Sequence, residues 1–118
     1  MEFEKLCELA AGEVKMIVDV LPEEVRPQAA GCPVYYEAKP LEGESIEEDA
    51  LGVFQGTPIV DEDQTGNPPR IRIFVENMWE YAERDEQDFL DEVGTTYLHE
   101  LSHYLGWDEE EVGEFDLE

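Results

Sequence analysis

Apolar residues recur at steps of three and four near the start of the chain, between residues 3 and 20. This spacing is typical of an amphipathic helix that buries one face. Pro22 follows two positions later and marks the end of the segment. We therefore predict a helix over residues 3–20, with a buried face formed by Phe3, Leu6, Ala10, Val14, Ile17 and Val18.

A second helical pattern begins at Asp85 and ends at Gly106. Asp85 is a suitable N-cap, and the acidic residues that follow it favour the positive end of a helix dipole. Gly106 can adopt the left-handed conformation that commonly ends a helix. We predict a helix from Asp85 to about Leu105, with an apolar stripe that faces the core and consists of Leu90, Val93, Tyr97, Leu101 and Leu105.

Three shorter segments, residues 34–38, 51–54 and 70–75, are rich in the β-branched and aromatic residues that favour strands. Residues 70–75 alternate basic and apolar side chains, which predicts a strand with one face in water. We expect this strand near the functional site, as a sheet edge on which an extended peptide could lie. Residues 42–49 are rich in acids and predict an exposed loop or a short helix.

The length and charge of the chain limit the classes of protein that it can belong to. With 118 residues it can form one hydrophobic core, and we expect a single domain over residues 1–118. It has 32 acidic and 7 basic residues, a net charge of -25. Such a surface repels phosphate backbones and anionic lipids, so neither nucleic acid nor a membrane is expected as a partner. The charge either forms a solvated surface or attracts basic peptides and proteins.

Features of targeting and redox chemistry favour a cytoplasmic protein. The residues from Met1 to Lys5 lack the basic and apolar segments of a signal peptide. No apolar run reaches the 18 residues that a membrane span needs. Cys7 and Cys32 have no patterned spacing, and without an export signal we expect them to be reduced thiols.

The two histidines of the chain, His99 and His103, lie four residues apart in the second predicted helix, with Glu100 directly after the first. Random placement would give this metal-site pattern in roughly one of three hundred chains of the same composition. At 3.6 residues per turn, both histidines lie nearly opposite the apolar stripe. Histidines buried in the core would lie on that stripe, so this position argues against a core role. The two histidines then either form a metal site or are simply exposed on the surface.

The spacing of these three residues suits hydrolysis assisted by zinc. Imidazoles at positions i and i+4 can present two nitrogens to one zinc ion at about 2.0–2.1 Å. Zinc lowers the pKa of a bound water towards about 7, and a neighbouring carboxylate can take the proton as the water attacks a carbonyl group. We therefore predict one zinc ion held by His99 and His103, with Glu100 as the general base.

A third ligand is expected because a catalytic zinc usually has three protein ligands. Glu109 is ten residues after His99, the offset of the third ligand in the HExxHxxGxxH pattern. Gly106 permits the turn that would bring Glu109 back towards the metal. Asp108 is the alternative, although it is also a suitable N-cap for a last short helix with Glu111 in a capping box. We predict Glu109 as the third ligand.

Residues 94–109, GTTYLHELSHYLGWDE, resemble the zincin metallopeptidases and, more narrowly, the bacterial minimal zincins, small cytoplasmic proteins with an HExxHxxGxxD-type motif near the C-terminus. Residues 51–58, LGVFQGTP, are similar to the LGxYxGxP segment of that family, and residues 70–74 are similar to the strand that follows it. The third ligand of the family is Asp, and the matching position here is Glu109.

This resemblance extends over roughly residues 33–112 and implies both a fold and an activity. The implied fold is α+β, with a small mostly antiparallel or mixed sheet of about three to four strands. The sheet would pack on an N-terminal helix and a C-terminal active-site helix. The implied chemistry is that of a zinc peptidase.

Three functions remain open from the sequence. The first is a zinc-dependent metallopeptidase that acts on a peptide or protein, with basic substrates favoured by the acidic charge. The second is a zinc-binding regulatory or interaction module without significant proteolysis, because little chain is left to build substrate subsites. The third is an acidic binding protein with a vestigial motif. Metal analysis separates the third from the others, and cleavage that depends on Glu100 separates the first from the second.

Overall fold

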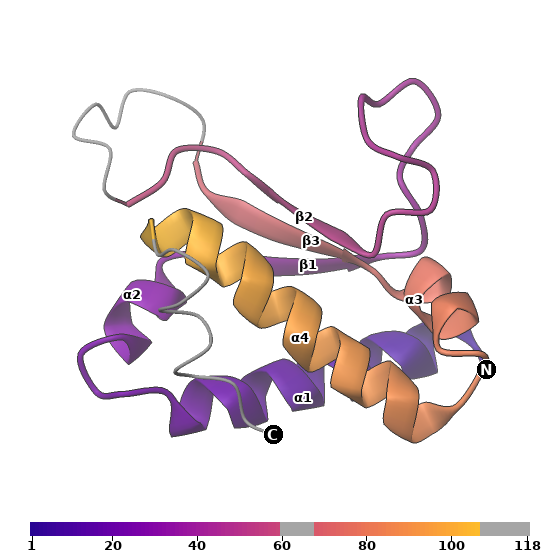
Figure 1. The fold of residues 1–118 in the computed structure, drawn as a ribbon, viewed down its shortest axis with the longest axis horizontal. Helices are drawn as coiled ribbons and strands as arrows, with labels where there is room; N and C mark the ends of the chain where they lie inside the picture. Colours follow the sequence, from indigo (N-terminus) through magenta and orange to yellow (C-terminus); the bar gives the residue numbers. More distant parts are fainter. Residues whose placement is uncertain (60–67, 107–118) are drawn as a thin grey trace.

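Four helices and three strands form the part of the chain that the computed structural model describes, residues 1–59 and 68–106. The strands make one layer, and α1 and α4 cover one face of it (Figure 1). This is the predicted α+β arrangement, with an N-terminal and a C-terminal helix packed on a small sheet. In chain order the elements are α1 (Phe3–Val20), α2 (Arg26–Ala30), β1 (Val34–Glu37), β2 (Gly52–Gln55), β3 (Arg70–Phe74), α3 (Val75–Tyr81) and α4 (Glu86–Leu105).

The sheet is mixed, with strand order β1-β3-β2. β1 runs parallel to β3, and β2 runs antiparallel to β3, with Phe54 opposite Ile71. The prediction that residues 70–75 form an edge strand is wrong, because β3 pairs on both sides and is the central strand. β2 is the edge strand that lies beside α4. The position of a strand in a sheet depends on which distant strands pair with it. The alternation of basic and apolar residues within one segment carries no information about that pairing.

The basic positions of β3 do not give it a face in water, which corrects a second expectation. Arg72 is only 7% exposed. Its guanidinium group lies 2.7 Å from a carboxylate oxygen of Glu37 and 2.7 Å from one of Glu44. It also lies over the ring of Phe74, 5.2 Å from the ring centroid. A buried arginine is stable only when it is paired, and here both partners are distant in sequence.

Helix α3 was not predicted, and it begins at Val75, which the sequence pattern placed in the preceding strand. No side chain caps its N-terminus, because the position before it is Phe74. The helix is stabilised by packing, since Val75 and Met78 are buried and Trp79 meets Phe89 edge-on at 5.7 Å between ring centroids. A helix that follows a strand directly, with no polar cap between them, lacks the usual start signal.

The core lies between the helices and the sheet, and the predicted helix over residues 3–20 is confirmed, although Phe3, which was expected on its buried face, is 39% exposed. Across the two described ranges, none of the helices is both long enough and apolar enough to cross a membrane. Cys7 and Cys32 are both free, and burial raises the pKa of the Cys32 thiol to about 11. Residues 42–49 form a loop rather than a helix. The main core side chains are Leu6, Ala10, Val14, Ile17, Ile71, Ile73, Phe89, Val93, Tyr97, Leu101 and Leu105.

Candidate metal centre

Helix α4 carries the three residues of the HExxH pattern in its last two turns. Its start is fixed by Asp85, whose side chain accepts a hydrogen bond from the Asp88 backbone N–H at 2.9 Å. Its end is fixed by Gly106, which has a φ of 72°, a left-handed conformation that glycine adopts readily. Both ends lie where the sequence predicted them.

His99 and His103 lie on the exposed side of α4, away from the core. The opposite side is the apolar stripe, of which Val93, Tyr97 and Leu101 are buried. The two imidazole rings are nearly perpendicular, with 4.9 Å between their centroids. Their Nε2 atoms are 3.3 Å apart. The histidines therefore point towards a shared position above the helix.

This separation fits a tetrahedral metal ion such as zinc. Two ligands bonded at about 2.0–2.1 Å with a tetrahedral angle between them lie about 3.3–3.4 Å apart. The measured distance of 3.3 Å between His99 Nε2 and His103 Nε2 agrees with this requirement. A carboxylate oxygen of Glu100 belongs to the same group, since ligand atoms of the three residues all lie within 4.8 Å of one another.

Glu100 is directed towards the sheet rather than between the histidines. Its Oε1 atom accepts a hydrogen bond from the backbone N–H of Phe54 in β2 at 2.9 Å. Burial raises the pKa of the Glu100 carboxyl, and the two histidines and the Phe54 N–H act in the opposite direction. The result is a partly buried carboxylate with a raised pKa beside two imidazoles, which suits a group that must accept a proton.

β2 can approach α4 this closely because it begins with a glycine. A Cβ atom at Gly52 would lie only 2.7 Å from the Cγ2 atom of Thr96 in α4 and 3.0 Å from the Arg72 carbonyl oxygen. Beyond β2, the backbone N–H of Ile59 donates to the carbonyl oxygen of Tyr104 at 2.8 Å. β2 and the residues that follow it are therefore held against the last turns of α4.

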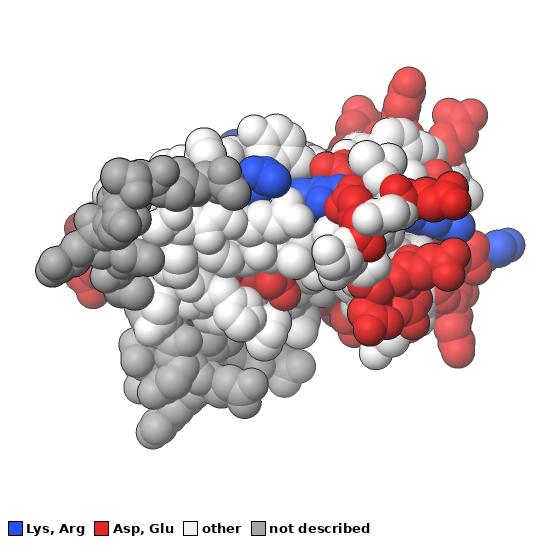
Figure 2. All heavy atoms as spheres, turned by 90° about the horizontal axis from the view of Figure 1, so that it is seen from above, with Lys and Arg blue, Asp and Glu red and all other residues white. Residues whose placement is uncertain are grey.

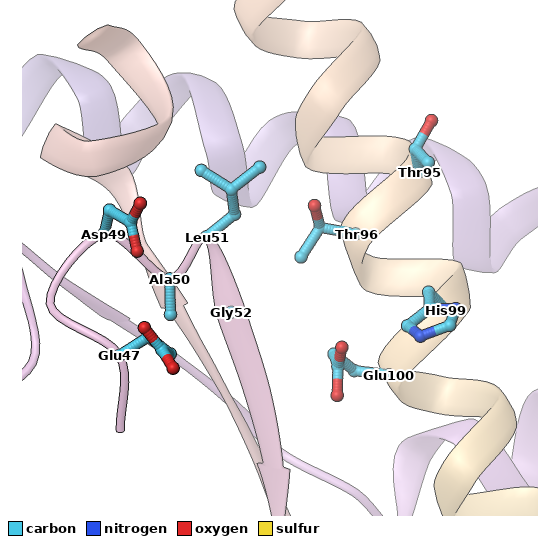
Figure 3. A pocket seen from close by; sticks show the side chains of 9 residues that line it. All are labelled: Glu47, Asp49, Ala50, Leu51, Gly52, Thr95, Thr96, His99 and Glu100. Carbon is cyan, nitrogen blue, oxygen red and sulfur yellow. The ribbon is translucent and has the colours of Figure 1, made fainter. Parts of the chain in front are cut away.

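Two adjoining pockets lie between β2 and α4, and Glu100 lines both of them. The larger has a volume of about 510 Å³ and contains His99; its walls come from α4 and from residues 47–52 (Figure 3). The smaller has a volume of about 380 Å³ and is lined by His103, Val53, Phe54 and Pro58. We call the two together the cleft. It passes directly over the three residues that could hold and use a metal ion.

The predicted third ligand, Glu109, and its alternative, Asp108, lie outside the described residues. The choice between them stays a prediction. Sequence reasoning missed the backbone N–H of Phe54 as a partner of Glu100, because an amide carries no sequence signal. The resemblance of residues 51–58 to a family segment was the one sign that this strand belongs to the site.

Comparison with known proteins agrees with the geometry of the site. A family model described as zincin-like metallopeptidase matches residues 13–118. The match extends over most of the chain and includes α4 with His99, Glu100 and His103. The chain therefore belongs to the zincin-like metallopeptidase family, as its resemblance to the minimal zincins predicts. A comparison with curated proteins gives no match.

Proposed function

We propose that this protein is a zinc-dependent metallopeptidase. In this proposal His99 and His103 hold one zinc ion, and Glu100 is the general base. The observation that carries it is the 3.3 Å separation of the two Nε2 atoms, with a Glu100 carboxylate oxygen in the same group. A hydrogen bond between the two imidazoles would give the same separation, so the proposal rests on that distance together with the Glu100 oxygen in the same group.

When bound, zinc would polarise the substrate carbonyl group and lower the pKa of a bound water. The chain itself supplies the base and its orientation. The Phe54 N–H holds Glu100 through Oε1, so Oε2 is the atom that takes the proton of the attacking water. Glu100 then passes that proton to the leaving amine. The bond to the Phe54 N–H fixes the direction of the carboxylate, so the same group can serve both proton transfers without reorienting.

The substrate in this proposal is an extended peptide or protein segment that lies in the cleft. Among the described strands β2 pairs with β3 alone, so its second edge faces α4. The Phe54 N–H on this edge already binds Glu100, so an added strand would pair with the remaining backbone groups of β2 while its side chains enter the pockets on either side. The cleft volumes of about 510 and 380 Å³ suit side chains on both sides of Glu100.

One observation favours the alternative, a zinc-binding regulatory or interaction module without significant proteolysis. The hydrogen bond from Phe54 already occupies one oxygen of the Glu100 carboxylate. A permanent bond of this kind would make Glu100 a structural link between α4 and β2. The two functions differ in whether metal-dependent cleavage occurs.

A chelation and reconstitution experiment tests the proposal. The protein, purified without a His tag, is incubated with a mixture of random-sequence peptides, and new termini are detected by mass spectrometry. We expect cleavage that stops after removal of metal and returns with one equivalent of zinc. Zinc binding without any cleavage would favour the interaction module, and failure to bind zinc would contradict both.

A further inference from the structure

The larger pocket of the cleft has one wall that belongs to neither α4 nor the sheet. Residues 47–51 form it, and we call this segment the loop wall. Figure 3 shows Glu47 and Asp49 of the loop wall on the side of the pocket opposite His99 and Glu100. A side chain entering the pocket from a peptide on β2 would therefore pass between these two carboxylates and the candidate metal centre.

Asn77 of α3 holds the loop wall in place. Its side-chain amide donates hydrogen bonds to the carbonyl oxygens of Glu48 and Ala50, at 2.8 and 2.9 Å. One side chain thus binds the backbone at two positions, which alternate with the acidic residues at 47 and 49. Two bonds from one planar amide fix the direction of the segment between them.

A second link holds the loop a few residues earlier. Both carboxylate oxygens of Glu44 accept hydrogen bonds from the buried Arg72 of β3, at 2.7 and 2.9 Å. The loop that leads into the wall is therefore tied to the centre of the sheet, and the wall itself is tied to α3. Glu47 and Asp49 are presented by an anchored backbone.

The acids of this region fall into two groups by their partners. Glu37 and Glu44 both form ion pairs with Arg72. Within the described chain, Glu47 and Asp49 take part in no ion pair, although they line a pocket. Figure 2 shows acidic side chains gathered at the end of the molecule that holds this loop and α3, while the middle of that face is mostly uncharged.

The two halves of the cleft therefore differ in chemistry. The pocket that contains His99 has in its wall two exposed carboxylates that form no ion pair with residues 1–59 or 68–106. Apart from Glu100 and His103, the pocket beyond Glu100 is lined by the apolar side chains of Val53, Phe54 and Pro58. A cationic side chain is stabilised in the first half, and an apolar side chain suits the second.

We propose that the loop wall, positioned by Asn77, selects peptides that carry a lysine or arginine side chain on one side of the cleaved bond. Glu47 and Asp49 are the specificity-determining residues, and Asn77 is a positioning residue. This inference rests on the proposed peptidase function and adds the class of its substrate. General attraction by an acidic protein would favour basic residues anywhere in the peptide. The preference proposed here is limited to one side of the cleaved bond and depends on two carboxylates.

The test uses a neutral peptide that the wild-type protein cleaves, with lysine, glutamine or glutamate placed in turn at three positions on each side of the cleaved bond. We expect lysine to raise kcat/KM about three- to tenfold over glutamine on one side only, and glutamate to lower it. An equal effect of lysine at all positions would overturn the inference and indicate general attraction.

Variants separate the loop wall from the net charge. The double substitution Glu47→Gln/Asp49→Asn should remove the preference for lysine. The matched control Glu23→Gln/Glu24→Gln changes the charge equally at exposed positions between α1 and α2, and should keep the preference. Asn77→Ala leaves the charge unchanged, yet should weaken the preference mainly through a higher KM, with zinc content unaltered. Equal loss in the two double variants would overturn the assignment to Glu47 and Asp49.

Binding to the Glu100→Gln variant keeps this inference separate from the proposed function. If the wild-type protein cleaves no peptide, the fluorescence anisotropy of the same labelled peptides is measured with this variant loaded with zinc. Binding about three- to tenfold tighter with lysine on one side, lost in the Glu47→Gln/Asp49→Asn background, would uphold the loop wall even without proteolysis. Cleavage or binding with no preference for lysine would overturn it.

Discussion

The carboxylate of Glu100 in α4 accepts a hydrogen bond from the backbone N–H of Phe54 in β2, 46 positions earlier in the chain, at 2.9 Å. The bond joins the proposed general base to the edge strand beside it. The HExxH pattern places Glu100 next to the histidines, but only the packing of β2 against α4 determines which way its carboxylate points. The candidate site is therefore completed by tertiary structure.

Zinc binding should depend on both histidines and should not depend on the rest of the α4 surface. We expect near-stoichiometric zinc in the wild-type protein by elemental analysis, and loss of zinc in His99→Ala and in His103→Ala. Both residues are exposed, so the circular dichroism spectrum should be retained. Asp91→Ala, an exposed position of the same helix, serves as the control and should keep its zinc. Zinc retained in both histidine variants would place the metal elsewhere.

The third ligand is tested by comparing Glu109→Ala with Asp108→Ala. We expect the affinity for zinc, measured by competition with a chelating dye, to fall at least about tenfold in Glu109→Ala. Loss of a residue that only hydrogen-bonds a metal ligand already lowers metal affinity about tenfold or more, and loss of the ligand itself should lower it at least as much. Asp108→Ala should change the affinity little. The reverse order would make Asp108 the ligand and place the family pattern one residue earlier in this chain.

The close contact between β2 and α4 predicts that Gly52→Ala is destabilising. The added Cβ would meet Thr96 Cγ2 at 2.7 Å, and such overpacking typically costs about 1–3 kcal/mol in the free energy of unfolding. Thr96→Ser removes that methyl group and should restore part of the loss in the double variant. Gly12→Ala in α1 is the control, since its Cβ meets nothing within 4 Å and should stabilise the helix by up to about 1 kcal/mol. Urea unfolding measures all four variants.

The link between Arg72 and Glu44 predicts a dependence of stability on pH. Hydrogen bonding to Arg72 lowers the pKa of the Glu44 carboxyl in the folded protein. Its stabilising effect is therefore fully present above the ordinary glutamate pKa of about 4.3, and is lost as the pH falls through the lowered folded value. Glu44→Gln should be less stable than wild type at pH 7, and the difference should shrink at pH 3. A difference independent of pH would contradict this link, and Glu42→Gln in the same loop should show little effect.

Local signals in the sequence were sufficient for the parts of the fold that local interactions determine. The periodicity of residues 3–20 predicted α1, and Asp85 and Gly106 marked both ends of α4. The spacing of His99 and His103 placed them on the face opposite the buried stripe. Each of these inferences depends on residues within one or two helical turns of one another.

Interactions between distant segments account for what could not be predicted. The alternation along the strand predicts that Arg72 faces solvent. In the folded protein it is buried, because folding brings Glu37 and Glu44 into contact with it. The central place of β3 follows from the parallel pairing with β1, which no local pattern reports. Asn77 has no catalytic signature in the sequence, and its link to the loop wall is visible only in the structure.

The claim that Glu100 is the base of a zinc peptidase is tested most directly by Glu100→Gln at matched zinc occupancy. The amide keeps the shape of the side chain and can still accept the Phe54 N–H, but it cannot accept a proton. The measurement is kcat/KM for a peptide that the wild-type protein cleaves, with zinc content determined on the same samples. We predict full zinc binding and a loss of at least about a hundredfold in kcat/KM. Cleavage at the wild-type rate by the zinc-loaded variant would contradict the account.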